Sequence, residues 1–265
     1  MENIAFRLHG RIHGTGRAPW LVFLHGFLGD GRDWDEIATE LKTHFSCLCV
    51  DLPGHGASRV ERPCAPGEIL DALFKLLDEC RIDRCGLIGY SMGGRVALRM
   101  AVAAPDRINR LVLESASPGI QADADRLARQ KADAAWMALM KEGGMEAFLE
   151  KWYAQPLFDT LCRNPARREE LHQRRMRQDP RQLAMALQSM GAGAWPPAWK
   201  DWPSLRMPAL LIAGRDDARY AAMAERMAAQ NSRAQVWIVS GCGHNVHWED
   251  PASYTAAIQK FLMDT

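Results

Sequence analysis

The residues with the clearest chemical meaning lie between Gly89 and Gly93, where the chain reads Gly-Tyr-Ser-Met-Gly. An apolar segment typical of a strand precedes this pattern, and an apolar helical pattern follows it. A G-x-S-x-G pattern between strand and helix is typical of a serine on a sharp turn, with its hydroxyl exposed above a sheet. Glycine suits the flanking positions because a Cβ would clash where strand and helix pack closely. The hydroxyl of Ser91 is therefore a candidate reactive group.

A serine hydroxyl becomes reactive only when a neighbouring base can accept its proton. His244, in the segment after the last predicted strand, is the expected base. An acid must then fix the tautomer of the imidazole and stabilise its charged form. Asp217 follows a glycine after the preceding strand and gives the order serine, aspartate, histidine. The adjacent Asp216 is the alternative acid.

An oxyanion formed in the reaction needs hydrogen-bond donors that are already in place. We expect the backbone N–H of Met92, at the start of a helix, and that of Phe27, in the His-Gly-Phe loop, to supply them. The other histidines near strand ends have simpler interpretations. His25 is expected to bond to loop backbone, His55 to belong to a turn, and His247 to be a helix cap or a surface group.

Short β-rich segments alternate with helical patterns, which is typical of a mostly parallel sheet covered by helices on both faces. The predicted fold class is therefore α/β. The predicted strands are Phe6–His9, Trp20–His25, Ser46–Asp51, Cys85–Tyr90, Arg110–Glu114, Ala209–Ala213 and Gln235–Val239. The predicted helices are Asp33–Lys42, Gly67–Cys80, Met92–Ala103, Tyr220–Gln230 and Pro251–Phe261.

The strand signal disappears between Ser117 and about Ser204, where alanine, methionine, arginine and tryptophan recur at helical spacing. We interpret residues 117–204 as a helical cap inserted into a core formed by residues 1–116 and 205–265. Ligands of open α/β sheets bind at the carboxyl ends of the strands. The candidate reactive residues all follow strands, so we expect them to meet at one edge of the sheet, beneath the cap.

Basic side chains near this edge indicate the substrate class. Arg95 lies one turn into the helix that begins after Ser91, where an aliphatic side chain would be ordinary. Arg126 and Arg129 lie at helical spacing in the cap, and a further arginine cluster surrounds Arg175; most of these are expected to be solvated. Guanidinium groups that converge on a pocket favour carboxylates. We therefore expect a small molecule with several carboxylates.

Length and composition exclude several other classes. The chain has 265 residues, 48% of them hydrophobic and 25% charged, which suits one large α/β domain. A net charge of +1 favours neither nucleic acid nor an anionic membrane surface as a partner. The seven scattered cysteines include no CxxC pair, which argues against a zinc site or a disulfide framework. With no signal-peptide pattern at Met1 and no membrane-spanning segment, we expect a cytoplasmic monomer.

The chain resembles the α/β-hydrolase superfamily, and more narrowly the 2-succinyl-6-hydroxy-2,4-cyclohexadiene-1-carboxylate (SHCHC) synthases of menaquinone biosynthesis. The general superfamily motifs are Trp20–Phe27, Val50–Gly56 and Gly243–His247. The more specific marks are Tyr90 beside Ser91, Arg95, Pro118–Gln121 with the arginines that follow, and Trp152–Pro156. The resemblance extends over nearly the whole chain.

This resemblance implies a lyase that releases pyruvate without a cofactor or a metal. Ser91, activated by His244 and Asp217, would act as a base toward a carbon-bound proton, and no acyl intermediate would form. The amides of Phe27 and Met92 would hold the enolate oxygen. By similarity, the residues that bind the substrate carboxylates are Arg95, Arg129 and Arg175, with Arg174 as the alternative to Arg175, and the residues that line the pocket are Tyr90, Trp152 and Tyr153.

Two other functions use the same residues differently. A carboxylesterase or carbon–carbon bond hydrolase would use Ser91 as a nucleophile, but an enzyme for neutral esters has little use for Arg95. A binding protein on an inactive hydrolase fold would not need to keep the serine, the aspartate and the histidine together. The arginines and the complete triad therefore favour the lyase.

Overall fold

The computed structural model describes residues 6–16 and 19–264, and residues 1–5 of the predicted core lie outside this part. The described chain forms one seven-stranded sheet in the order β1-β3-β2-β4-β5-β6-β7. Only β1 runs antiparallel to its neighbour, and all other pairs are parallel. The strands are β1 (His9–His13), β2 (Trp20–Leu24), β3 (Ser46–Asp51), β4 (Cys85–Tyr90), β5 (Ile108–Glu114), β6 (Ala209–Gly214) and β7 (Ala234–Val239).

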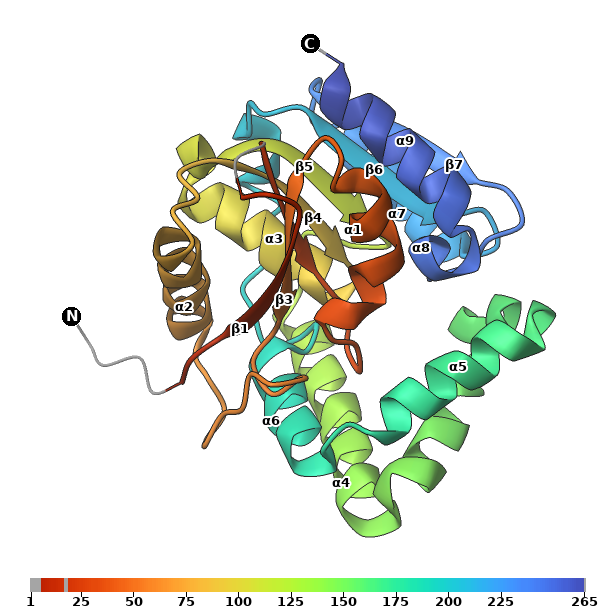
Figure 1. Ribbon diagram of the computed structural model, residues 1–265. Coiled ribbons are helices and arrows are strands. Elements are labelled where there is room, and N and C mark those ends of the chain that lie inside the picture. The colour runs from red at the N-terminus through yellow and green to blue at the C-terminus, as the bar shows by residue number, and fades with distance from the viewer. Residues whose placement is uncertain (1–5, 17–18, 265) are drawn as a thin grey trace.

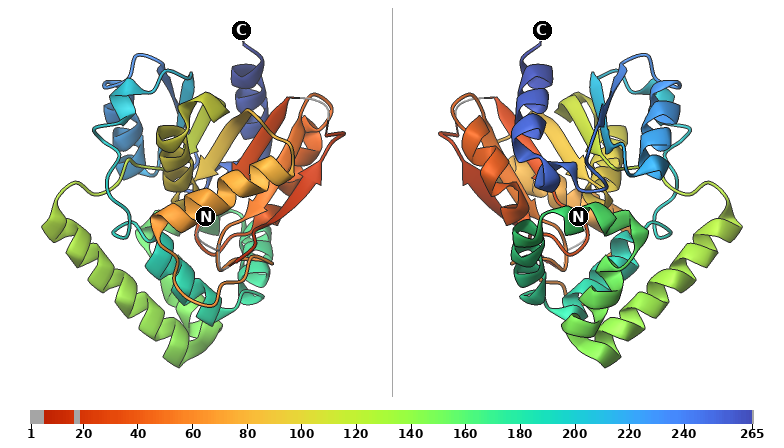
Figure 2. Two further views of the ribbon diagram at one scale, coloured as in Figure 1. Left: turned by 90° about the vertical axis from the view of Figure 1, so that its left-hand side faces the viewer. Right: turned by 90° about the vertical axis from the view of Figure 1, so that its right-hand side faces the viewer.

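Helices cover both faces of this sheet (Figures 1 and 2). One face packs against α1 (Asp35–Leu41) and α9 (Pro251–Met263). The opposite face packs against α2 (Pro66–Glu79), α3 (Met92–Ala103) and α7 (Ala218–Ala228). Every residue of β3, β4 and β6 is buried, as a parallel strand with both faces covered requires. The predicted α/β fold class is confirmed.

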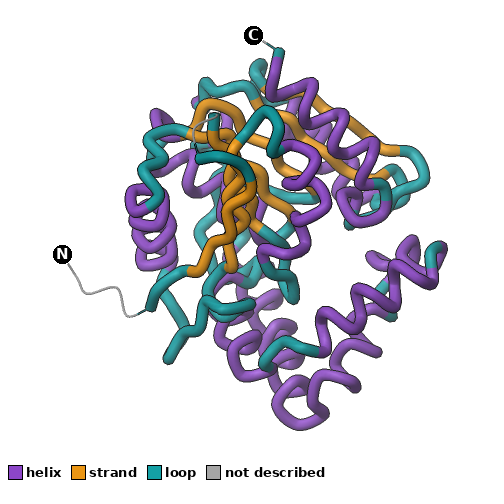
Figure 3. Tube along the Cα trace, viewed as in Figure 1, coloured by secondary structure: helices purple, strands orange, loops and turns teal. Residues whose placement is uncertain are grey.

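The regular elements between β5 and β6 in the described chain are all helices, and they lie together beyond the carboxyl ends of the strands (Figures 1 and 3). These elements are α4 (Asp123–Tyr153), the 3₁₀ helix η3 (Pro156–Arg163), α5 (Pro165–Met176), α6 (Pro180–Met190) and the 3₁₀ helix η4 (Trp202–Ser204). Gly144 has a φ of 71° and a ψ of −176°, so α4 is two helices joined at a kink. The two parts and α6 bury a small apolar cluster around Met140, Phe148 and Leu187, and Leu28, from the loop after β2, is part of it.

The predicted elements lie within three residues of the observed ones, with two exceptions. The strand predicted at Phe6–His9 is wrong, because β1 begins at His9 and ends at His13. Leu8 and Phe6 are apolar because they pack on the core, whereas β1 is an edge strand with no buried residue. The second difference is the short helix α8 (Val246–Glu249), which is separate from α9. Within residues 6–16 and 19–264, no helix is long and apolar enough to cross a membrane.

Candidate active site

Ser91 lies on a strained turn between β4 and α3. Its φ of 49° and ψ of −106° are unusual for a residue with a side chain, and such strain is found mainly at functional sites. Two glycines allow the turn to form. A Cβ on Gly93 would lie 2.3 Å from the carbonyl oxygen of Leu24, and one on Gly89 would lie 2.6 Å from that of Gly93. The sharp turn inferred from the sequence pattern is therefore present.

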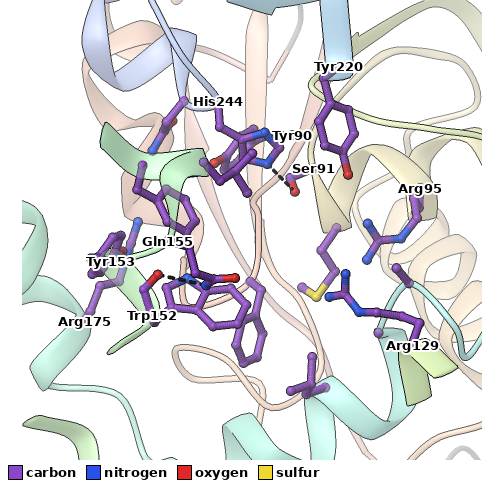
Figure 4. Close-up of a pocket in the computed structure, with 18 residues that line it drawn as sticks. Tyr90, Ser91, Arg95, Arg129, Trp152, Tyr153, Gln155, Arg175, Tyr220 and His244 are labelled. Atoms are coloured by element: carbon purple, nitrogen blue, oxygen red, sulfur yellow. Dashed lines mark hydrogen bonds between the residues drawn. The ribbon is translucent and has the colours of Figure 1, made fainter. Parts of the chain in front are cut away.

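Ser91, His244 and Asp217 form a hydrogen-bonded row, and Figure 4 shows its bond between Ser91 and His244. The Nδ1 of His244 lies 2.7 Å from Oδ2 of Asp217, and its Nε2 lies 3.0 Å from Oγ of Ser91. Because a carboxylate can only accept, Nδ1 carries the proton and Nε2 is free to accept from the serine hydroxyl. His244 and Asp217 are only 3% and 5% exposed, so little water competes for these bonds.

The choice between the two adjacent acids follows from the start of α7. Asp217 is the N-cap of this helix and accepts a hydrogen bond from the backbone N–H of Tyr220 on its other oxygen, Oδ1. This second bond fixes the carboxylate that faces His244. Asp216 instead pairs with Arg163 at 2.6 Å on the protein surface. The geometry thus brings Asp217, and not Asp216, to the histidine.

The two backbone N–H groups expected to form an oxyanion hole belong to Phe27 and Met92. Both residues line the same cavity as Ser91. Within the part of the chain that the structure describes, neither N–H has a hydrogen-bond acceptor. Free donors beside a serine hydroxyl suit a ligand oxygen that gains negative charge.

The remaining histidines have structural surroundings. His25 accepts from the N–H of Leu52 on Nε2 and donates from Nδ1 to the carbonyl of Gly26, and His55 bonds within its turn, as expected. The expectation for His247 is wrong, because this side chain is neither a cap nor on the surface. It is buried, donates to the fully buried carboxylate of Glu114 at 2.7 Å, and stacks on Trp34.

One cavity at the carboxyl ends of the strands gathers ten of the eleven predicted site residues (Figure 4). The eleventh, Asp217, does not line the cavity but bonds to His244. The cavity lies between the sheet and the helical segment 117–204. The predicted residues that line it are Phe27, Tyr90, Ser91, Met92, Arg95, Arg129, Trp152, Tyr153, Arg175 and His244.

Arg95 and Arg129 lie near each other on one side of the cavity (Figure 4). Arg129 pairs with Asp133 at 2.8 Å, one turn further along α4. Among the described residues Arg95 has no acidic partner within ion-pair distance, and it donates only to the carbonyl of Met190 at 3.1 Å. Burial is the largest influence and lowers the pKa of Arg95; Tyr220 opposes this, and the nearby Arg129 lowers the pKa further. This wall therefore has positive charge available for an anion.

Arg175 lies on the opposite side of the cavity, next to Tyr153 (Figure 4). Its guanidinium makes two parallel hydrogen bonds to the buried carboxylate of Asp33, at 2.9 and 2.7 Å. Burial disfavours the charge, but Asp33 and Tyr153 raise the pKa of Arg175 above its ordinary value, so the guanidinium keeps its charge. Arg174 does not line the cavity: it pairs with Glu170, lies over the ring of Trp248, and approaches Asp33 only to 3.9 Å. Of the two, Arg175 is the one in the cavity.

Sequence reasoning missed several cavity residues. Tyr220 lies in the first turn of α7, and its ring centre is 4.8 Å from that of His244. The sequence could have indicated Tyr220 as a cavity residue, because it follows Asp217 by one helical turn and the start of α7 must face His244. Gln155 is part of the Trp-Tyr-x-Gln-Pro motif but had no assigned role. The others are Leu157, Phe158, Leu187, Gly191, Ala192 and Asn245.

Comparison with known proteins identifies the family. The profile described as "Alpha/beta hydrolase family" matches residues 21–258, which is most of the chain. The chain belongs to the α/β hydrolase family. Among curated relatives, an SHCHC synthase of Escherichia coli O7:K1 is 32% identical over 96% of this chain and 98% of its own length. The SHCHC synthase of Citrobacter koseri is also 32% identical, over 94% and 96% of the two chains.

Another relative is much longer. The chloroplastic protein PHYLLO of Arabidopsis thaliana is 30% identical over 95% of this chain, which spans only 16% of the length of that protein. Among solved structures, MenH from S. aureus superposes with a TM-score of 0.91 at 32% identity, covering 96% of this chain and 97% of its own. An enol-lactonase from Burkholderia xenovorans shares the hydrolase fold, with a TM-score of 0.82 at 24% identity over 98% and 97% of the chains. The resemblance to the SHCHC synthases is confirmed.

Proposed function

We propose that this α/β hydrolase is an SHCHC synthase, a carbon–oxygen lyase of menaquinone biosynthesis. It would eliminate pyruvate from 2-succinyl-5-enolpyruvyl-6-hydroxy-3-cyclohexene-1-carboxylate. The observation that carries this proposal is the unpaired guanidinium of Arg95 in the cavity that holds Ser91. A partly buried cation without an acidic partner is costly unless a ligand supplies the counter-charge. The relatives and the MenH structure support the same conclusion.

The two sides of the cavity differ in the net charge that they offer to the substrate carboxylates. Arg95 and Arg129 present a net positive wall, because Asp133 offsets only one of them. Arg175 is already neutralised by Asp33, so it offers directed N–H donors more than net charge. We infer that one carboxylate binds between Arg95 and Arg129. Tyr90, Trp152 and Tyr153 would then hold the ring and the apolar part of the succinyl chain.

The hydrogen-bonded row supplies the base. Ser91 would remove the carbon-bound proton beside the succinyl carbonyl while its own proton passes to Nε2 of His244. The imidazole becomes positively charged in this step, and the carboxylate of Asp217 at Nδ1 stabilises that charge. The serine oxygen forms no bond to carbon, so no acyl intermediate arises.

The two free N–H groups act on the charge that develops. As the proton leaves, the succinyl carbonyl becomes an enolate, whose oxygen would accept hydrogen bonds from Phe27 and Met92. Collapse of the enolate breaks the ring carbon–oxygen bond to the enolpyruvyl group. That group departs as the enolate of pyruvate and takes up a proton at its CH₂ carbon. Loss of the extra proton from the imidazolium of His244 balances this step and restores the neutral base, and the ring product is SHCHC. Every step uses groups of this chain, and no cofactor takes part in the proposed sequence.

We also propose that residues 117–204 act as a cap that completes the site, since Arg129, Trp152, Tyr153 and Arg175 all come from it. The seven cysteines are free thiols, most of them buried, which supports a reducing compartment such as the cytoplasm. The monomeric state stays a prediction.

The test compares two substrates. The wild-type protein should release pyruvate from the cyclohexene substrate, and Arg95→Ala should reduce kcat/KM for it by about 100-fold or more, because a charged hydrogen bond is lost. Hydrolysis of a neutral p-nitrophenyl ester, if measurable, should change far less. Equal losses on both substrates would indicate a folding defect, and ester hydrolysis without pyruvate release would support the hydrolase instead.

A further inference from the structure

The segment before His244 contains two glycines, Gly241 and Gly243, so it has few side chains that could fix its backbone by packing. Gly241 has a φ of 78°, and Gly243 must lack a side chain because a Cβ there would lie 2.2 Å from Oγ1 of Thr160. Asp217 and Ser91 hold only the ring of His244. Something else must therefore fix the peptide groups from which that ring projects.

Glu249, the last residue of α8, bonds to these peptide groups on both sides of the histidine. Its Oε2 accepts from the N–H of Gly243 at 3.0 Å, and its Oε1 accepts from the N–H of Asn245 at 3.2 Å. The backbone N–H of Glu249 also donates to the carbonyl of Asn245 at 2.9 Å. One residue thus closes three hydrogen bonds around the segment 243–245.

The helix that carries Glu249 is itself fixed to the sheet. The backbone N–H and the ring of His247 both donate to the buried carboxylate of Glu114, at 3.1 and 2.7 Å. Glu114 is the last residue of β5, and its carbonyl accepts from the N–H of Ser91 at 2.8 Å. A continuous set of hydrogen bonds therefore runs from the Ser91 backbone through α8 to the backbone of His244.

We propose that Glu249 is a positioning residue that holds His244 at proton-transfer distance from Ser91. The inference rests on the proposed role of His244 as the base. A carboxylate suits the task because it presents two acceptors and no donor, and both partners are N–H groups. Misplacing a catalytic group by about 1 Å can cost on the order of 100-fold in rate.

The surroundings of Glu249 match this role. Burial raises the pKa of its carboxyl group, and the N–H of Gly243, the hydroxyl of Thr160 and the N–H of Asn245 oppose that rise. A glutamine in its place would keep the size of the side chain, but its NH₂ group would face one of the two N–H donors. That bond would be lost and two donors would repel each other, so the loop would move.

The test uses Glu249→Gln with a matched control one residue away. Asp250→Asn makes the same change from carboxylate to amide, but the Asp250 carboxylate caps α9 by accepting from the N–H of Ser253. Among the described residues it makes no hydrogen bond to the segment 243–245. Asparagine caps helices as well as aspartate does. Thr255→Val, which removes a buried hydrogen bond to Pro251 within α9, reports what a loss of stability alone does.

Two readouts separate positioning from stability. For Glu249→Gln we expect kcat for pyruvate release to fall at least about tenfold while KM changes less than about twofold, because Glu249 bonds to none of the arginines proposed to bind the substrate carboxylates. Labelling of Ser91 by a fluorophosphonate, which needs the same proton transfer to His244 but no particular substrate, should slow about as much. Asp250→Asn and Thr255→Val should keep both rates at the wild-type level.

The outcomes distinguish this inference from the proposed function. A wild-type kcat and labelling rate in Glu249→Gln would overturn the inference. So would an equal loss in Thr255→Val. If the wild-type protein released no pyruvate, the proposed reaction would fail, and the labelling rates alone would decide the role of Glu249.

Discussion

At the scale of single residues, the proposed base depends on the two hydrogen bonds of His244: Asp217 holds its Nδ1, which leaves Nε2 to accept from Ser91. Local patterns, a glycine-flanked turn and a strand-end loop, predict the positions of Ser91 and His244. The choice between Asp216 and Asp217 depends on which carboxylate caps α7, and that is a property of the folded helix. His247 was misread because its partner, Glu114, is distant in sequence and gives no local signal.

The adjacent acids provide a direct residue-scale prediction. Asp217→Asn should lower kcat by about 10³- to 10⁴-fold, because an amide can donate to Nδ1 and then favours the wrong tautomer of His244. Asp216→Asn breaks only a surface ion pair with Arg163 and should leave kcat within about twofold. Steady-state pyruvate release measures both. A larger loss in Asp216→Asn would contradict the assignment.

At the scale of elements, apolar periodicity predicts the buried strands and helices closely. β4 and β6 are buried along their whole length, so their composition alone indicates parallel strands. The edge strand β1 has no buried face and therefore no apolar pattern. The apolar residues that suggest a strand here are Phe6 and Leu8, which precede β1 and pack on the core. The four-residue helix α8 is too short for any periodicity to show.

The turn between β4 and α3 gives the element-scale prediction. Gly93→Ala would place a Cβ 2.3 Å from the carbonyl oxygen of Leu24, the last residue of β2. The start of α3 would therefore have to move away from the end of β2. We expect a loss of about 2 kcal/mol or more in the free energy of unfolding. Gly67→Ala, in the first turn of α2 where nothing lies within 4 Å, should be neutral or stabilise by up to about 1 kcal/mol. Urea unfolding followed by circular dichroism compares them, and equal stabilities would refute the argument.

At the scale of the whole molecule, the sequence predicts that the segment between β5 and β6 is helical, but it does not predict how this segment attaches to the sheet. Arg175 and Asp33 are 142 positions apart in the sequence, and only the fold brings them together. The same holds for Arg167 and Glu36, a partly exposed pair between α5 and α1. No spacing rule connects residues so far apart.

These two ion pairs should differ greatly in their contribution to stability. Asp33→Asn leaves the buried guanidinium of Arg175 without its counter-charge, which should cost about 3–5 kcal/mol. Glu36→Gln breaks the exposed pair and should cost less than about 1 kcal/mol. Chemical denaturation of both variants tests the difference. Equal small losses would mean that Arg175 is not held as the structure indicates.

The central claim is that Ser91 acts as a base in a cavity built for a polycarboxylate. Its most direct measurement is pyruvate release from 2-succinyl-5-enolpyruvyl-6-hydroxy-3-cyclohexene-1-carboxylate by the wild-type protein and by Ser91→Ala, followed with lactate dehydrogenase and NADH. We predict one pyruvate per substrate for the wild type, and a rate lower by about 10³-fold or more for the variant. A wild-type rate no faster than the spontaneous reaction, or an unchanged rate in Ser91→Ala, would contradict the claim.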